Sequence, residues 1–314
     1  MRATYILPIK ASDARRAPEL AAYLASLEDL QIIIVDGSPD RIFEEHGAHL
    51  RGALLHVPPA CDISGANGKT RGVLTGLRYA ACDKIIVADD DVRHDRKSID
   101  YLLKALESTD AVLPQNYFEP APWHAILDTS RTLLNRVTGG DWPGTIAFRK
   151  SLLPFGYNAD VLFENYEMVR TIASNGGRIL RADDCYVKRR PPTFQQYRDQ
   201  RIRQAYDELA RPRRLALQLA ILPLCLALWA LRLRPLLLAG ALLSIAAAEV
   251  GRRKSHGKLR FSPLASAAVP IWILERGICS WLAMYSRVRH GGIRYAGAIL
   301  ASAASPKNAS PGAV

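Results

Sequence analysis

The stretch Lys84-Ile85-Ile86-Val87-Ala88-Asp89-Asp90-Asp91 decides how the rest of the chain is interpreted. Its apolar part is typical of a buried strand, and three adjacent carboxylates follow it directly. Like charges this close repel one another, and a strand end does not need them for folding. A divalent cation such as Mg²⁺ or Mn²⁺ would relieve the repulsion, because hard cations prefer carboxylate oxygens. The triplet therefore suggests an enzyme that acts on a nucleotide diphosphate. The alternative is a solvated acidic turn.

The N-terminal part of the chain alternates strand-like and helix-like segments. The strand-like runs are Thr4–Ile9, Gln31–Val35, Ala53–Val57, Lys84–Ala88 and Ala111–Pro114, and the helical ones are Pro18–Leu30, Lys69–Ala81 and Lys97–Leu106. This alternation predicts an α/β domain with a mostly parallel sheet. Such sheets bind ligands beyond the carboxyl ends of their strands, which is where Pro8, Asp36 and the acidic triplet fall.

Two further motifs follow predicted strands or open predicted helices. In Val35–Asp40, the Asp36 carboxylate can accept hydrogen bonds from a base or a ribose, although the motif is also a common turn. Gly65–Arg71 is a glycine-rich, basic entry to a helix, where backbone N–H groups with Lys69 or Arg71 can meet a phosphate. Its spacing is not that of a P-loop, and an ordinary flexible loop is the alternative.

The positive charge is confined to the last third of the chain. The net charge is +12, but residues 1–210 hold 27 Lys and Arg against 28 Asp and Glu, whereas residues 211–314 hold 15 against 2. That last third is also the most apolar part, so its basic residues flank hydrophobic runs. This pattern favours a membrane and argues against a nucleic-acid partner.

Two apolar runs, Leu215–Leu231 and Pro235–Val250, predict a helical hairpin of membrane spans, each close to the roughly 20 residues that cross a bilayer. Basic clusters on both sides of the hairpin place its two ends in the cytoplasm. The alternative is a buried hairpin in a soluble protein. Residues 262–286 are expected to form a third span or an interfacial helix, and residues 291–314 a flexible tail.

The compartment follows from two weaker signals. The five cysteines are scattered without a Cys-x-x-Cys pair, which argues against a disulfide framework or a zinc site and favours a reducing compartment. The apolar stretch Tyr5–Ile9 is too short for the core of a secretory signal. We therefore expect residues 1–210 to stay in the cytoplasm.

Taken in order, four motifs resemble those of the family 2 glycosyltransferases with the GT-A fold: Ile6-Leu7-Pro8-Ile9, Val35-Asp36-Gly37-Ser38, Gly68-Lys69-Thr70-Arg71-Gly72 and Asp89-Asp90-Asp91. The resemblance extends to about residue 205, and membrane helices often follow the catalytic domain in that family. It implies that Asp36 contacts the nucleotide and that Asp89 and Asp91 hold a divalent metal and the diphosphate.

The resemblance continues on the acceptor side. Gly139–Lys150 is similar to the family's acceptor loop and the strand after it, and Trp142 is either a surface for a sugar ring or a core tryptophan. Glu164–Arg170 is similar to the helix that carries the catalytic base, but Asn165 stands where an Asp is expected. Because an amide cannot accept the acceptor's proton, Glu164 or Glu167 takes that role, the motif is shifted by one residue, or the protein is catalytically weak.

Gln200–Gln204 resembles the Gln-x-x-Arg-Trp motif of membrane-bound family members. Gln200 and Arg203 match that motif, whereas Gln204 replaces the tryptophan. A stacking surface is therefore missing, which argues against processive polymer synthesis.

Together these patterns predict a GT-A domain over residues 1–210, a membrane region over residues 211–290 and the tail. The expected activity is the inverting transfer of a sugar, at the inner membrane, from a UDP-linked nucleotide-sugar donor to a lipid, lipid-linked or polysaccharide acceptor. The alternatives are a nucleotidyltransferase on a related fold, and a membrane protein that binds a nucleotide-sugar with little or no turnover.

Overall fold

The computed structural model describes residues 1–50, 54–295 and 297–306 of the chain. It divides into two compact units. The first comprises Met1–Asn116, Trp142–Lys188 and the segment from Ser305, and the second comprises Tyr117–Asp141 and Arg189–Ala304.

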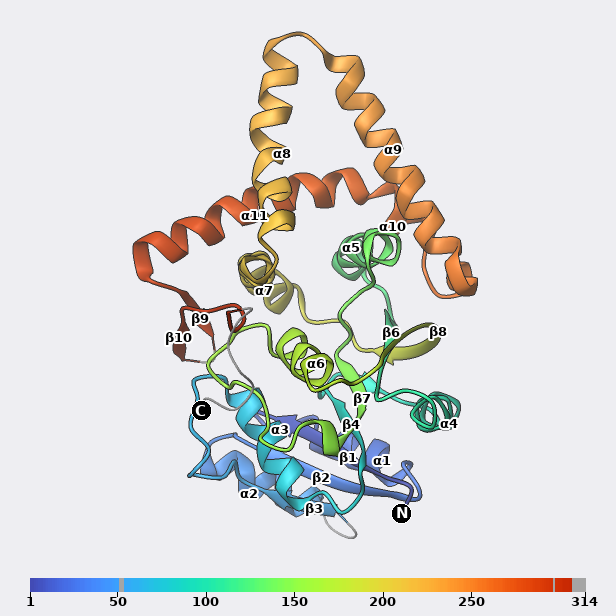
Figure 1. Ribbon diagram of the computed structural model, residues 1–314, viewed down its shortest axis with the longest axis vertical. Coiled ribbons are helices and arrows are strands. Elements are labelled where there is room, and N and C mark those ends of the chain that lie inside the picture. The colour runs from blue at the N-terminus through green and yellow to red at the C-terminus, as the bar shows by residue number, and fades with distance from the viewer. Residues whose placement is uncertain (51–53, 296, 307–314) are drawn as a thin grey trace. The chain divides into compact units, whose positions relative to one another are not determined.

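The first unit is built on an eight-stranded sheet of order β3-β2-β1-β4-β7-β6-β8-β5 (Figure 1). Strands β3, β2, β1 and β4 pair in parallel, and β7 pairs antiparallel with both β4 and β6. The sheet is therefore mostly parallel in the half that ends at the acidic triplet, as the sequence predicts. The strands are β1 Ala3–Ile9, β2 Leu30–Asp36, β3 Leu54–Val57, β4 Lys84–Ala88, β5 Val92–Arg93, β6 Ala111–Phe118, β7 Thr145–Arg149 and β8 Ile179–Arg189.

Helices cover both faces of this sheet, which explains why the central strands are apolar throughout. On one face α1 (Ala17–Ala25) and α4 (Arg96–Ala105) pack through residues such as Leu24 and Leu102. On the other face α3 (Gly68–Tyr79) and α6 (Glu164–Ser174) pack through residues such as Val73 and Met168 (Figure 1). A further helix, α2 (Asp40–His49), follows β2.

The start of α3 is fixed by its own sequence. The Asn67 side chain accepts hydrogen bonds from the backbone N–H groups of Lys69 and Thr70, at 3.0 and 3.2 Å, and so caps the helix. Farther along α3, Gly76 lies so close to β1 that an added Cβ would be 2.5 Å from Ile6 Cγ2. The cap and this close approach place Lys69 in the first turn, next to the end of the strands.

The second unit is helical, with the small antiparallel pair β9 (Ile293–Tyr295) and β10 (Ala298–Leu300) near its end. Within it, α8 and α9 run as an antiparallel hairpin and α11 crosses that hairpin (Figure 1). Its helices are α5 Trp123–Thr138, α7 Phe194–Tyr206, α8 Pro212–Ala230, α9 Arg234–Arg253, α10 Pro263–Ala267 and α11 Val269–His290.

Two helical segments among the described residues are long and apolar enough to cross a membrane: Pro212–Ala230, and Arg234–Leu259, which includes α9. That criterion concerns length and composition only. In each segment only 11% of the most apolar 18-residue window is buried. Residues 262–286 do not meet the same criterion: α10 is too short, and in α11 polar residues such as Glu275 and Arg276 lower the mean hydropathy.

Several segments differ from the expectation. The helix expected over Pro18–Leu30 ends at Ala25, since Leu30 already belongs to β2, and the strand expected over Ala111–Pro114 continues to Phe118. In place of a flexible tail from residue 291, the chain forms β9 and β10, because these two short strands pair with each other. Residues 307–314 of the expected tail lie outside the described residues.

Candidate active site

The centre of the candidate site is Lys69, on the first turn of α3. Its Nζ lies 2.5 Å from Asp89 Oδ1 and 2.7 Å from Glu164 Oε1, and each of the three side chains is less than a fifth exposed. Burial alone would lower the pKa of Lys69, but the carboxylates of Asp89 and Glu164 outweigh burial and raise it well above its usual value. Lys69 is therefore a permanent cation that joins a strand end to a helix start 75 residues away.

The acidic triplet separates into residues with different environments. Asp89 directly follows β4 and donates its backbone N–H to Gly144 O at 2.7 Å. Asp90 is exposed, whereas Asp89 and Asp91 are half-buried. The middle residue therefore faces solvent and the outer two are the candidates for ligand binding.

The donor set at the triplet fits a hard divalent cation. Among the described residues no group of three or more His, Cys, Asp or Glu side chains is arranged to hold a metal. Asp89 and Asp91 would thus supply only carboxylate oxygens, and the remaining ligands would have to come from a substrate. That is the usual situation for Mg²⁺, which is held by one or two carboxylates together with substrate phosphates.

Asp36 lies at the end of β2, with its side chain fully buried, and it is bound by two histidines. Its Oδ2 is 2.6 Å from His46 Nδ1 and 3.0 Å from His56 Nε2, and its Oδ1 accepts the backbone N–H of Ser38 at 2.9 Å. Burial would raise the pKa of Asp36, but the hydrogen bonds from His56, Ser38 and His46 lower it to about 2. The carboxylate is therefore ionised and held in one orientation.

The sequence interpretation missed both histidines. The signal for His56 was available, because β3 pairs in parallel with β2 and His56 lies opposite Ile34 in that register. The imidazole therefore lies at the same end of the sheet as Asp36. His46 lies on α2, a helix that the sequence interpretation did not predict.

A third histidine that the sequence interpretation missed, His94, forms a hydrogen bond next to these strand ends. His94 is buried, and burial lowers its pKa to about 4, so the ring is neutral at physiological pH. Thr145 Oγ1 donates to Val87 O at 2.7 Å, so it accepts from His94 Nε2, which lies 3.0 Å away. This contact ties the start of β7 to the end of β4.

Two other predicted residues lie close to these strand ends. Pro8 is the penultimate residue of β1 and packs tightly against Gly72. A Cβ added to Gly72 would lie 2.9 Å from Pro8 Cβ. Arg71, on the first turn of α3, has a buried Nε for which no hydrogen-bond partner exists among the described residues. A buried donor without a partner commonly marks a place where a ligand or water binds.

The first turn of α6 holds the three candidates for the catalytic base, and each has a different partner. Glu164 contacts Lys69, as described above. Asn165 Nδ2 donates to Pro143 O at 2.9 Å. Glu167 is only 4% exposed, lies 3.5 Å from Arg170, and accepts the backbone N–H of Ser305 at 3.0 Å. Only Glu164 therefore shares a cluster with the acidic triplet.

Trp142 lies beside the same turn and is packed by other aromatic rings. Its ring meets those of Phe163 and Tyr166 edge-on, with centroids 5.4 and 5.2 Å away, and the Arg181 guanidinium lies 4.8 Å from its centroid. The side chain is half-buried. These contacts favour packing as the main role of Trp142, and its use as a sugar platform stays a prediction.

Gln200 and Arg203 belong to α7, in the second unit. The Arg203 guanidinium lies 4.8 Å from the Tyr295 ring centroid, and Gln200 is half-buried. Gln204, at the position of the family's tryptophan, accepts a hydrogen bond from Arg201 through Oε1. That Gln200 and Arg203 help to bind the nucleotide-sugar stays a prediction.

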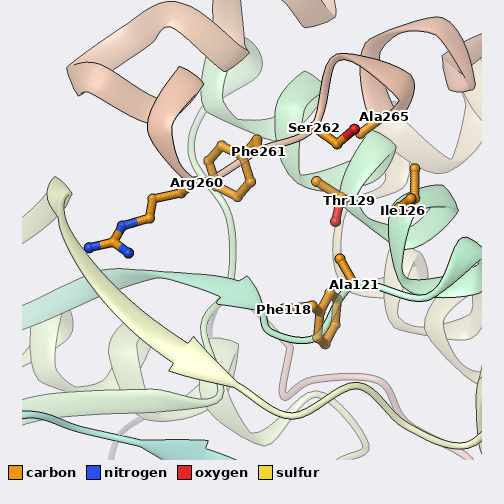
Figure 2. Close-up of a pocket in the computed structure, with 8 residues that line it drawn as sticks. All are labelled: Phe118, Ala121, Ile126, Thr129, Arg260, Phe261, Ser262 and Ala265. Atoms are coloured by element: carbon orange, nitrogen blue, oxygen red, sulfur yellow. The ribbon is translucent and has the colours of Figure 1, made fainter.

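A small cavity in the second unit is not a candidate donor site. It lies between α5, α10 and the segment before α10, and its volume is about 10 Å³ (Figure 2). That is room for about one water molecule, whereas pockets for drug-sized ligands measure roughly 300–1,000 Å³. Its lining residues are Phe118, Ala121, Ile126, Thr129, Arg260, Phe261, Ser262 and Ala265.

Comparison with known proteins finds a family for part of the chain and solved structures with a similar fold. Residues 14–162 match the model of glycosyl transferase family 2. A mannosyltransferase from Pyrobaculum calidifontis, solved with GDP-mannose and Mn²⁺, is 19% identical, with 88% of this chain and 86% of that chain covered and a TM-score of 0.56. At this identity the likeness supports the fold alone.

A glucosyl-3-phosphoglycerate synthase from Mycobacterium tuberculosis, solved with Mn²⁺, UDP and glucosyl-3-phosphoglycerate, is 16% identical over 62% of this chain and 73% of that chain, with a TM-score of 0.43. No curated protein matches the chain significantly. The family match covers the strand ends next to Asp36, Asp89 and Asp91 and the first turn of α3 with Lys69. The match to glycosyl transferase family 2 therefore covers residues 14–162, slightly under half of the chain.

Proposed function

We propose that the chain is a membrane-bound, inverting glycosyltransferase that moves a hexosyl group from a nucleotide-sugar donor, taken first as UDP-linked, to a lipid or lipid-linked acceptor. The observation that carries this proposal is the contact of Lys69 with both Asp89 and Glu164. It brings a strand-end carboxylate, a cation and a helix-start carboxylate into one largely buried cluster. Such a cluster can bind a diphosphate and a nucleophilic hydroxyl side by side.

The donor would lie across the carboxyl ends of β1, β2 and β4, where open α/β sheets bind nucleotides. Asp36, ionised and held by its histidines, would accept hydrogen bonds from the nucleoside. Lys69 and the unpartnered Nε of Arg71 would contact the diphosphate. Asp89 and Asp91 would hold Mg²⁺ or Mn²⁺ through carboxylate oxygens. When bound, the metal neutralises charge on the departing diphosphate.

Glu164 is the proposed general base. Its carboxylate would take the proton of the acceptor hydroxyl as that oxygen attacks the anomeric carbon, and a single in-line displacement inverts that carbon. Glu167 is a poor candidate because its carboxylate is 4% exposed and already bound by Ser305 and Arg170. Asn165 has no proton-accepting group of suitable basicity.

The membrane part of the proposal rests on the second unit. Leu217, Leu226 and Leu243 are each about 70% exposed on the α8–α9 hairpin. Exposed apolar side chains on two adjacent helices are costly in water and favourable in a bilayer. We propose a cytoplasmic catalytic domain over residues 1–210 and a membrane region over residues 211–290, with both ends of the hairpin in the cytoplasm.

We propose that α11 lies in the membrane interface and does not form a third span. One side of this helix buries polar groups, among them Arg276 and Ser280, and the other exposes apolar ones, such as Ile271, Ile278 and Trp281. A helix with this division, lying across a spanning hairpin, suits the boundary between headgroups and acyl chains (Figure 1). Basic segments near both ends of the hairpin would attract anionic headgroups, which favours a lipid-linked acceptor over a growing polysaccharide.

The deciding experiment is a donor screen on detergent-solubilised protein with Mg²⁺ or Mn²⁺. UDP- and GDP-linked sugars would be offered with a membrane-lipid extract, and nucleoside diphosphate release and sugar transfer would be measured together. We expect release coupled to transfer for one donor class. Pyrophosphate release would identify a nucleotidyltransferase instead. If nucleotide-sugars bound but none was turned over, the chain would be a nucleotide-sugar-binding protein without transferase activity.

Membrane attachment has its own test. After expression of the full chain, membranes would be washed at high salt and then at alkaline pH, and the protein traced in each fraction. A chain with a spanning hairpin stays with the membrane in both washes. Release by alkali, or recovery in the soluble fraction without detergent, would mean that α8 and α9 do not span.

A further inference from the structure

The loop that contains Pro143 and Gly144 lies between β4 and α6 and forms hydrogen bonds with three other segments of the chain. Gly144 N–H donates to Asn116 Oδ1 at 2.7 Å, and Gly144 O accepts the backbone N–H of Asp89 at 2.7 Å. One residue earlier, Pro143 O accepts from Asn165 Nδ2 at 2.9 Å. The loop thus connects the end of β4 directly to the first turn of α6.

Two routes therefore link Glu164 to Asp89. One is the Lys69 ammonium between the two carboxylates. Because a lysine side chain is flexible and is expected to turn toward a bound diphosphate, this route cannot hold the spacing during turnover. The other route runs from Asn165 through the loop to the Asp89 backbone, and it consists of a short side chain and peptide groups. It can persist while substrate binds.

We propose that Asn165 is a positioning residue whose amide N–H ties the first turn of α6 to Pro143 and so keeps Glu164 at its working distance from Asp89. This inference rests on the proposed function, in which Glu164 is the base. It also explains why Asn stands at position 165 where an Asp is expected, because the hydrogen bond to Pro143 O needs a donor there.

The chemistry of the side chain explains why Asp would not serve here. An ionised carboxylate has only acceptors, so an Asp at this position would face the Pro143 carbonyl oxygen without a hydrogen. Two acceptors at hydrogen-bond distance repel, and the first turn of α6 would move away from the loop. A protonated carboxylic acid regains one O–H donor and could restore the bond.

The test compares Asn165→Asp and Asn165→Ala with the wild-type full chain in detergent, using the donor that the screen identifies. We expect kcat/KM for the acceptor to fall in both variants, on the order of tenfold for Asn165→Ala and a hundredfold for Asn165→Asp, since displacements of about 1 Å can cost that much. Binding of the nucleoside diphosphate with Mn²⁺, measured by calorimetry, should change less than about threefold, because the Asp36 and Asp89 ends stay in place.

The pH dependence separates positioning from catalysis. If the lost donor is the cause, the deficit of Asn165→Asp relative to wild type should shrink as pH falls toward about 4 and the introduced carboxylate is protonated. A carboxylate that acted as base would do the opposite, and activity would rise with pH through that range. Glu164 and Glu167 on α6 and Lys69 on α3 are charged groups near this turn, and all are present in both proteins.

Asn175→Asp is the matched control. Asn175 ends the same helix, is exposed, and donates Nδ2 to Leu152 O at 2.8 Å, so the same chemical change removes the same kind of bond away from the site. We expect this variant to retain wild-type kcat/KM and its ordinary pH profile.

Two results would overturn the inference. One is a gain of activity in Asn165→Asp, which would mean that the wild type lacks its base. The other is an equal loss in Asn165→Asp and Asn175→Asp, which would mean general destabilisation. Failure of the proposed function is distinguishable from either, because the wild type itself would then release no nucleoside diphosphate.

Discussion

The end of β4 and the first turn of α6 are both acidic in sequence, yet they differ in how much the sequence says about them. At the end of β4 the three carboxylates alternate in exposure, and the outer pair, Asp89 and Asp91, is the half-buried one. At the start of α6, neighbouring side chains reach Lys69, the Pro143 carbonyl and the Ser305 backbone. The residues after a strand lie at one known edge of the sheet, whereas the side chains of one helical turn point toward several different neighbours.

The largest effect is expected at the strand end. Asp91→Asn should lower metal-dependent turnover roughly a thousandfold, because metal stabilisation of the departing charge is worth several kcal/mol. Asp90→Ala should stay close to wild type, since Asp90 is exposed. Steady-state turnover against Mn²⁺ concentration measures both. Equal losses in the two variants would remove the distinction between the outer and middle carboxylates.

The second largest effect is expected from substitution of the proposed general base, Glu164. Glu164→Gln should reduce kcat about a hundredfold or more, as general base catalysis contributes roughly 10²–10⁴. The matched change Glu167→Gln should leave kcat within a few-fold of wild type, although it is three residues away on the same helix. Donor affinity, measured separately, is expected to remain in both. If Glu167→Gln were the inactive variant, the assignment of the base would have to be reversed.

A smaller effect on stability should distinguish the same two glutamates. Glu167→Ala would leave the Ser305 N–H without its acceptor, which costs about 1–3 kcal/mol for a buried polar group. For a unit of this size that corresponds to a fall in Tm of a few degrees, on the order of 2–10 °C. Differential scanning fluorimetry would detect it. An unchanged Tm would show that the bond between Glu167 and the Ser305 backbone does not contribute to stability in solution.

The smallest expected effect concerns pH. The folded-state pKa of Asp36, about 2, is below the ordinary Asp value, so ionisation of Asp36 favours the folded state. That contribution is present above the ordinary pKa of about 4 and is lost as pH falls toward 2. The difference in Tm between wild type and Asp36→Asn should therefore narrow from pH 6 to pH 3. A constant difference would mean that the histidines do not depend on the Asp36 charge.

The sequence by itself determined the α/β unit and the position of the acidic triplet after a strand. Strand-like segments such as Ile85–Ala88 that alternate with helical ones such as Val73–Leu77 bury their apolar side chains in an α/β layer arrangement. In such a sheet, a carboxylate that directly follows a strand falls at the edge where ligands bind. It also determined where long apolar helices lie, because uninterrupted apolar runs are visible without any tertiary contact.

The tertiary structure alone decided the rest. It gave Asp36 its partners His46 and His56, which are 10 and 20 residues away along the chain. It also separated Glu164 from Glu167 by a contact with Ser305, 138 residues beyond Glu167. Local periodicity fixes which face of a helix or strand is apolar, but hydrogen bonds between remote segments depend on how those faces pack. For this reason the sequence located the carboxylates, and only the fold determined what each one contacts.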